Sequence, residues 1–324
     1  MTAFDRAVAH QFPHQTKKNG DDPMPAILTH YLFSEMVAPP CIDDMLSGNM
    51  YVWGSQGPDF LFFSPPVHPH WRMLSRIGGL MHEQDMDQNF AFMADCCKKA
   101  EGMEKKILLS YFYGFLSHYI LDRTFHPYVY GMQRYFKTIL PKASDNYLHR
   151  QIETNLDVLF LKRLRSMTIQ DFSVISHLRR IPELNTVCEM YRELFRSRFE
   201  QTFSIRAISH SFLSMKLLYS FFYSPRGFKR RAVTFAKHLT ENSYPAVMAL
   251  IHPVEPGTEI DYANIKRAVH EPGNDALEHT AYELFGIARQ AYKTFFPLAE
   301  RLCRDGGDFS AITQGINFEG DPAR

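Results

Sequence analysis

The stretch GFLSHYILDRTFHPY, residues 114–128, carries a histidine, an aspartate and a second histidine at four-residue intervals. His118 and Asp122 continue the helical spacing of the apolar position Phe115, so on a helix all three share one face. Burying an ionised carboxylate is costly unless the group is paired or binds a metal ion. The pattern leaves two interpretations open: an Asp–His hydrogen bond inside a core, or a metal site that also takes in His126.

Two other pairs place a histidine four residues before an acid, and a helix presents such a pair to one ion. His149 and Glu153 border an apolar stripe and by themselves fit either a metal site or a solvated helix edge. His279 and Glu283 have no other candidate ligand near them, so we treat them as unrelated to a metal site. Only about 0.07 His-acid-His triples are expected by chance at this composition, so residues 118–126 give the stronger signal.

The elements that must position these residues are predicted to be helices. Helical periodicity marks the stretches THYLFSEMV, QNFAFMADCCKKA, EKKILLSYFYGFLSHYILDRTF and DNYLHRQIETNLDVLFLKRL. Further helices are expected at 185–203, 208–222, 228–240 and 275–302. The Gly- and Pro-containing stretches SQGPDFLFFSPPVHPHW and HPVEPGTEIDY indicate loops. With no alternating strand pattern and no internal repeat, the sequence predicts an all-α, multi-helix bundle.

The length of 324 residues suits one large domain or two ordinary ones. Residues 1–23 are polar and end in NGDDP, so we expect a flexible lead, with Met24 as an alternative start. The remainder, 24–324, is expected to form a single α-helical domain. Its predicted parts are a core at 24–165 that holds the candidate site, added helices at 166–305 and a tail at 306–324.

Composition argues against several classes of protein. Hydrophobic residues make up 45% and charged residues 22%, as in a globular protein. Thirty-six Lys and Arg balance 35 Asp and Glu, so we expect no stable nucleic-acid partner. Five scattered cysteines without a CxxC motif indicate a reducing compartment. Neither a signal-peptide pattern nor an apolar run of about 18 residues is present, and the expected location is the cytoplasm.

One local basic cluster, formed by Arg226, Lys229, Arg230 and Arg231, stands out from this balance. We interpret it as the solvated start of a helix. The neighbouring stretch SFLSMKLLYSFFY, residues 211–223, fits either a core helix or a surface that meets lipid. Peripheral contact with a membrane therefore stays open.

Five stretches occur in one order and together carry a family resemblance. They are PAILTHYLF, GSQGPDFLFF, GGLMHEQ, GFLSHYILDRTFHPY and HRQIE. The ordered set resembles the zinc-dependent phospholipase C family, relatives of bacterial phosphatidylcholine-hydrolysing phospholipase C and, more distantly, of P1-type nucleases. The resemblance covers about residues 24–165 and implies an all-α bundle that holds two or three zinc ions.

By position, the resemblance also implies the ligands of each ion. The ligands of the first would be Asp59, His82, His118 and Asp122. Those of the second would be His126, His149 and Glu153, and those of the third would be His30 and a shared Asp122. The mixture of imidazoles and carboxylates suits zinc and leaves positions for water and phosphate.

Two features depart from the pattern of the relatives. In the secreted relatives a processed N-terminus completes the third site, whereas 29 residues precede His30 here. His10 and His14 belong to the polar lead and are not expected to replace that terminus. Pro127 disfavours helical geometry at His126, so we expect His126 to lie at a helix end and to turn towards a different ion from His118.

The resemblance implies hydrolysis of a phosphodiester, most closely a phosphatidylcholine-type phospholipid, by attack of metal-bound hydroxide on the phosphate. Asp59 is expected to be both a ligand and the general base. A choline group binds over aromatic faces and a nucleobase stacks on them, so neighbouring aromatic side chains are candidate substrate contacts. These are Phe60, Phe62 and Phe63. His68 and His70 are expected in the same loop, near the mouth of the site, but not as ligands.

Two other hypotheses remain. One is a P1-type nuclease or nucleotidase, although Glu153 stands where those enzymes usually carry aspartate, which slightly favours the phospholipase. The other is a non-catalytic protein that keeps zinc for stability and serves as a binding module. The second hypothesis predicts a protein that retains zinc but hydrolyses no phosphoester.

Overall fold

The computed structural model describes residues 26–65, 68–239, 246–257 and 259–323. It is 68% helical and, over these residues, contains eleven α-helices and no strand, which confirms the predicted all-α class. The helices are α1 Ile27–Val37, α2 Met45–Gly54, α3 Trp71–Glu83, α4 Met86–Lys99, α5 Gly102–Ile139, α6 Asp145–Arg165, α7 Leu184–Phe199, α8 Ile205–Phe222, α9 Phe228–Leu239, α10 Ala281–Asp305 and α11 Ser310–Thr313. The predicted lead at 1–23 lies outside the described residues.

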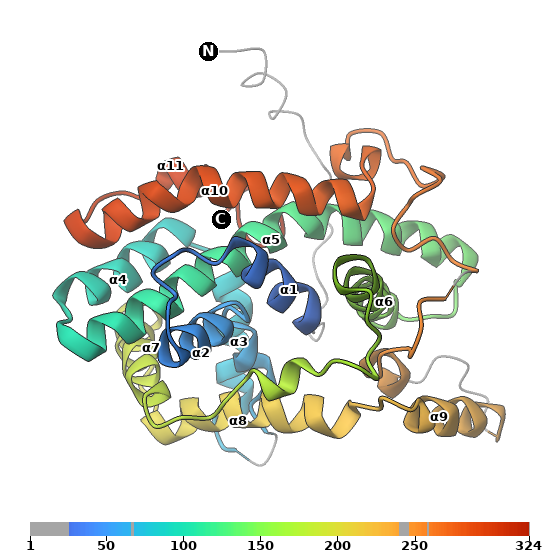
Figure 1. Ribbon diagram of the computed structural model, residues 1–324, viewed down its shortest axis with the longest axis horizontal. Coiled ribbons are helices and arrows are strands. Elements are labelled where there is room, and N and C mark those ends of the chain that lie inside the picture. The colour runs from blue at the N-terminus through green and yellow to red at the C-terminus, as the bar shows by residue number, and fades with distance from the viewer. Residues whose placement is uncertain (1–25, 66–67, 240–245, 258, 324) are drawn as a thin grey trace.

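Helix α5 runs through the middle of the bundle and packs against α1, α2, α4, α6, α7 and α10 (Figure 1). A single cluster of buried apolar side chains extends from Ile27 to Phe318, so the C-terminal helices share their core with the N-terminal part. That residues 24–324 form a single domain stays a prediction. Among the described residues, no helix combines the length and the apolar character needed to cross a lipid bilayer.

Helix α5 does not end at Pro127, so the expectation that His126 lies at a helix end is wrong. The helix continues to Ile139 and keeps His118, Asp122 and His126 in line on consecutive turns. A proline inside a helix costs about 3 kcal/mol, because it removes one hydrogen bond and crowds the preceding turn. Burial of side chains on both sides of Pro127, among them Phe125, Tyr128 and Val129, outweighs that cost.

Besides the four-residue α11, two helices, α2 and α3, were not predicted from the sequence. Both contain glycines that lower helix propensity, two in each segment. In α2 one of them serves the packing: a Cβ on Gly54 would lie 2.0 Å from the carbonyl oxygen of Tyr111 in α5. The facing Gly114 of α5 has the same role, since its Cβ would lie 2.1 Å from the carbonyl oxygen of Tyr51. The two glycines let α2 cross α5 in backbone contact, one turn before His118.

The segment predicted as a loop between α2 and α3 contains a short 3₁₀ helix, η2 (Asp59–Phe63). The chain enters it through Gly57, whose φ of +55° is left-handed. A Cβ there would lie 2.1 Å from Cδ2 of the His118 ring. Glycine at this position therefore lets the loop close over α5 and bring Asp59 to the line of polar residues on that helix.

Candidate metal centre

All eight residues predicted as ligands are buried, and they gather where α1, η2, α3, α5 and α6 meet. Their side chains come from five separate elements and none is more than 7% exposed. They form three groups in which one ligand atom from each residue lies within 4.8 Å of the others. The groups are His30, Asp59 and His118; His82, His118 and Asp122; and His126, His149 and Glu153.

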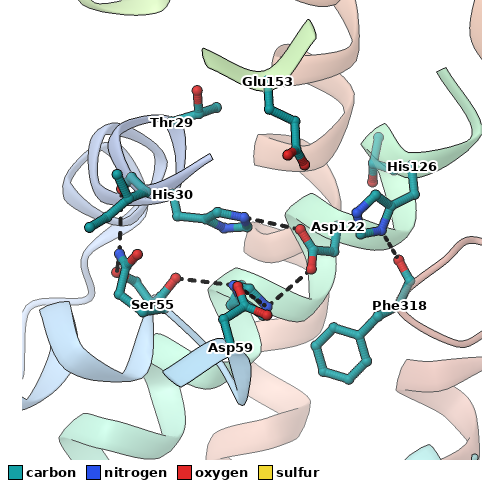
Figure 2. Close-up of polar contacts among 12 residues, drawn as sticks. Thr29, His30, Ser55, Asp59, Asp122, His126, Glu153 and Phe318 are labelled. Atoms are coloured by element: carbon teal, nitrogen blue, oxygen red, sulfur yellow. Dashed lines mark hydrogen bonds and ion pairs between the residues drawn. The ribbon is translucent and has the colours of Figure 1, made fainter. Parts of the chain in front are cut away.

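Asp122 is the link between the groups (Figure 2). Its Oδ1 lies 3.0 Å from Nε2 of His30, and its Oδ2 lies 3.0 Å from Nε2 of His118. On the other side of His118, Asp59 Oδ2 lies 3.6 Å from the same Nε2 atom. Asp59 Oδ1 accepts a hydrogen bond at 2.9 Å from Nε2 of His82. One carboxylate thus stands between two imidazoles, which is the arrangement expected of a shared ligand.

The third group lies one turn further along α5. His149 Nε2 and Glu153 Oε1, both on α6, are 3.2 Å apart, and the ring centres of His126 and His149 are 5.8 Å apart. The other oxygen of Glu153, Oε2, is buried and has no hydrogen-bond partner. A cavity of about 20 Å³, lined by His30, Asp122, His126 and Glu153 among others, adjoins it. That volume holds one water molecule or one ion, so these residues fit a bound metal.

Four of the five histidines are oriented in the same way. Each uses Nδ1 to bond an oxygen outside the groups and turns Nε2 towards a carboxylate or the cavity. The oxygen partners are Gly78 O for His82 (2.7 Å), Ser55 O for His118 (3.2 Å), Phe318 O for His126 (2.7 Å) and Gln133 Oε1 for His149 (3.2 Å). Such outer bonds fix the ring and the tautomer of metal-binding histidines, and the pattern supports a metal site.

The family model described as zinc dependent phospholipase C matches residues 27–211. The chain belongs to this family. Comparisons with curated proteins and with solved structures find no match. The matched region begins at α1 and ends within α8, so it contains all eight candidate ligands. The family is zinc-dependent and hydrolytic, and the three groups could hold its metal.

The ionisable groups of this zinc-dependent phospholipase C fold perturb one another strongly. Burial disfavours the protonated His82 ring, but the hydrogen bond and the charge of Asp59 outweigh it and raise the pKa of His82 to about 9. Burial raises the pKa of Glu153 well above its ordinary value. For Asp122, burial acts in the same direction, but the charges of His118 and His30 dominate and lower its pKa well below the ordinary range.

These shifts predict that zinc affinity increases with pH. Protonated His82 stabilises the metal-free fold; this contribution is full below its unfolded pKa of 6.5 and is lost as the pH rises through about 9. Zinc must displace that proton, so between these limits affinity is expected to rise about tenfold per pH unit for each proton released. A chelator-competition titration at several pH values measures it. An affinity that does not change over this window would contradict the protonation scheme.

Sequence reasoning missed the C-terminal tail as a wall of the site. The Phe318 main chain donates its N–H to His82 O at 3.1 Å and accepts the His126 Nδ1 hydrogen bond through its carbonyl. The Phe318 ring lies 4.8 Å from the His82 ring and 5.5 Å from that of His118. These contacts use backbone atoms and an ordinary aromatic ring, so no motif could have indicated them. The tail also lies outside the matched family region.

A substitution of Gly320 tests whether the C-terminal tail positions His126. Gly320 has a φ of +78°, and a Cβ on it would lie 2.4 Å from Cγ of Pro127 in α5. Gly320→Ala should push the tail away from His126 and lower zinc affinity about 10- to 100-fold, the usual effect of losing an outer hydrogen bond. Gly315→Ala is the matched control, because its φ is +68° but its Cβ would meet nothing within 4 Å. Equal zinc affinity of the two variants would exclude a positioning role for the tail.

Asp157 anchors the start of α1, the helix that carries His30. The N-cap of α1, Ala26, offers no side-chain cap. Instead the Asp157 carboxylate, on α6 one turn after Glu153, accepts the N–H groups of Leu28 (3.3 Å) and Thr29 (2.7 Å). It also accepts the Thr29 hydroxyl at 2.6 Å. A carboxylate at a helix N-terminus is stabilising, and here it ties the start of α1 to the helix that carries His149 and Glu153.

The three aromatic residues predicted to contact substrate have different places. Phe60 is fully buried and stacks on Phe212 with ring centres 3.6 Å apart, so it packs in the core instead. Phe63 is also buried, against Tyr219. Phe62 is half-buried, with its ring centre 5.3 Å from that of His82. Of the three, Phe62 alone combines partial exposure with contact to a candidate ligand.

Among the described residues, His68, His70 and His279 belong to none of the three groups. Glu283 forms a capping box with Thr280 at the start of α10 and pairs with Arg267, a structural role that fits the prediction for His279 and Glu283. His68 and His70 lie before α3, where the main-chain N–H of His70 donates to His68 Nδ1. His10 and His14 lie outside the described residues.

Proposed function

We propose that this member of the zinc-dependent phospholipase C family hydrolyses phosphodiesters, with phosphatidylcholine-type phospholipids as its substrates. The observation that carries the proposal is the set of eight buried His, Asp and Glu side chains in three groups, two of which are linked through Asp122 and His118. Zinc held there would lower the pKa of a water molecule and stabilise charge on the phosphate oxygens. The site residues and the substrate are our assignment, made from this geometry and the family.

Asp59 is proposed as the general base. Its Oδ1 is occupied by the hydrogen bond from His82, while Oδ2 faces His118 at 3.6 Å. With zinc in place of the His82 proton, one oxygen of Asp59 would bind the ion and the other would take up the proton of the attacking water. His82 is itself anchored by its bond to Gly78 O, so the carboxylate is held in one orientation.

Phe62 is proposed as the contact for the choline group of the substrate. Its half-buried ring beside His82 can hold a quaternary ammonium over its face by cation–π attraction.

The cavity at the cluster has room for an ion or a water molecule but not for a phosphodiester. Substrate binding therefore requires the side chains around the cavity to move.

An assay of the zinc-loaded protein on phosphatidylcholine and, in parallel, on single-stranded DNA tests the proposal. We expect release of phosphocholine and no cleavage of DNA. DNA cleavage without phospholipid hydrolysis would assign the site to a nuclease. Retention of zinc with no hydrolysis of either substrate would indicate the non-catalytic alternative.

A further inference from the structure

The charge of the chain is unevenly distributed. Residues 201–240, which include α8 and α9, contain seven Lys and Arg and no Asp or Glu. The rest of the chain carries 29 Lys and Arg against 35 Asp and Glu and is therefore net negative. Because most of this segment lies beyond the matched family region of 27–211, its charge belongs to this chain's own C-terminal helices.

The same two helices expose large apolar side chains. Phe221, Phe228 and Phe235 are 64–67% exposed, and they are the three phenylalanines among the exposed large apolar residues of the described part of the chain. Leu217, one turn before Phe221 on α8, is 57% exposed. The opposite side of α8 is buried in the core, through Phe212, Met215 and Tyr219 among others. The sequence left two interpretations of residues 211–223 open, a core helix or a surface that meets lipid. The buried face of α8 fits the first, and its exposed face fits the second.

Lys229 holds the two helices together at this surface. Its Nζ lies 5.2 Å from the centre of the Phe221 ring and donates to the carbonyl of Tyr223 at 3.1 Å, at the C-terminal end of α8. Arg230 points inward and donates to Ile251 O at 2.6 Å, which anchors α9 to the following segment. Arg226 and Arg231 stay exposed.

We propose that α8 and α9 form a docking surface for the anionic face of a phospholipid bilayer. The two helices lie end to end along one edge of the molecule (Figure 1), and the spacing of Phe228, Arg231 and Phe235 places them on one face of α9. Phenylalanine side chains enter the interface of a bilayer and basic residues attract anionic head groups. The surface goes beyond the proposed function, because binding to a bilayer requires no hydrolysis.

The inner side of α8 leads from this surface towards the metal centre. Tyr219, Phe222 and Tyr223 line an apolar cavity of about 30 Å³ together with Ile27 and Leu28 of α1. His30, one of the candidate ligands, is on the next part of the same short helix α1. The helix of the proposed docking surface and the helix that carries His30 therefore border the same apolar cavity.

Co-sedimentation of the full-length protein with vesicles tests the surface. One set of vesicles contains phosphatidylcholine alone, and the other contains equal parts of phosphatidylcholine and phosphatidylserine. We expect binding to the second set, about 30-fold weaker in the variant Arg226→Ala/Arg231→Ala and at least about tenfold weaker in Phe228→Ser/Phe235→Ser. Arg289→Ala/Lys293→Ala, at exposed positions of α10, is the matched control and should bind like the wild type.

Hydrolysis of a short-chain, monomeric phosphatidylcholine separates this inference from the proposed function. The arginine and phenylalanine double variants should match the wild type on that substrate, because none of the changed residues belongs to the metal centre. Equal binding of the wild type and these double variants to anionic vesicles would overturn the inference, as would absence of vesicle binding by the wild type. Binding of single-stranded DNA in place of vesicles would reassign the surface to nucleic acid.

Discussion

Replacing Asp122 with asparagine is expected to remove nearly all phosphodiester hydrolysis. Asp122 lies between His30 and His118 at 3.0 Å from each, so one substitution removes a charged ligand from two proposed sites at once. The loss of several kcal/mol of transition-state stabilisation corresponds to at least about a 10³-fold decrease in kcat/KM. Zinc content should fall in parallel, and both quantities can be measured on the same preparation.

The control for Asp122→Asn is Glu104→Gln, which removes an exposed acid from the first turn of the same helix. This variant should retain the activity and the zinc of the wild type. The shared-ligand assignment would be wrong if Asp122→Asn bound zinc normally and kept most of its activity.

Asp59→Asn should separate chemistry from metal binding. The amide oxygen of asparagine can still act as an uncharged oxygen ligand, so most of the metal should remain. The amide cannot take up a proton at neutral pH, and losing a general base lowers kcat by about 10²- to 10⁴-fold. Steady-state kinetics and metal analysis of the same sample measure the two effects.

For Asp59→Asn, the decrease in kcat has to be compared with the decrease in bound zinc. A decrease in kcat far greater than the decrease in zinc would support the role as general base. Proportional losses of kcat and zinc would make Asp59 a ligand and nothing more. A fully active variant would remove Asp59 from the chemistry altogether.

Periodicity and spacing carried much of the information about the fold and the candidate site. The all-α class was predicted correctly because most helices bury a regular apolar stripe. Two of the helices that were missed, α2 and α3, contain glycines whose cost in helix propensity is outweighed by tertiary packing. The error at Pro127 has the same origin, since burial of α5 outweighs the local preference of a proline.

The candidate ligands could be predicted because their chemistry lies in the side chains and their positions match a family pattern. The groups that orient these ligands could not be predicted. The carbonyl groups of Ser55, Gly78 and Phe318 bond three of the histidines, and a backbone carbonyl has no signature in a sequence. Phe60 is the opposite case. Its aromatic ring suggested a contact with substrate, whereas its packing on Phe212 places it in the core.

Metal analysis of the purified protein, beside a His118→Ala control, tests the central claim most directly. His118 is fully buried and belongs to two of the three groups, so its loss should deplete zinc at both. We predict two or three equivalents of zinc in the wild type and a clear decrease in the variant. A wild-type protein that holds no zinc after purification and reloading would contradict the account.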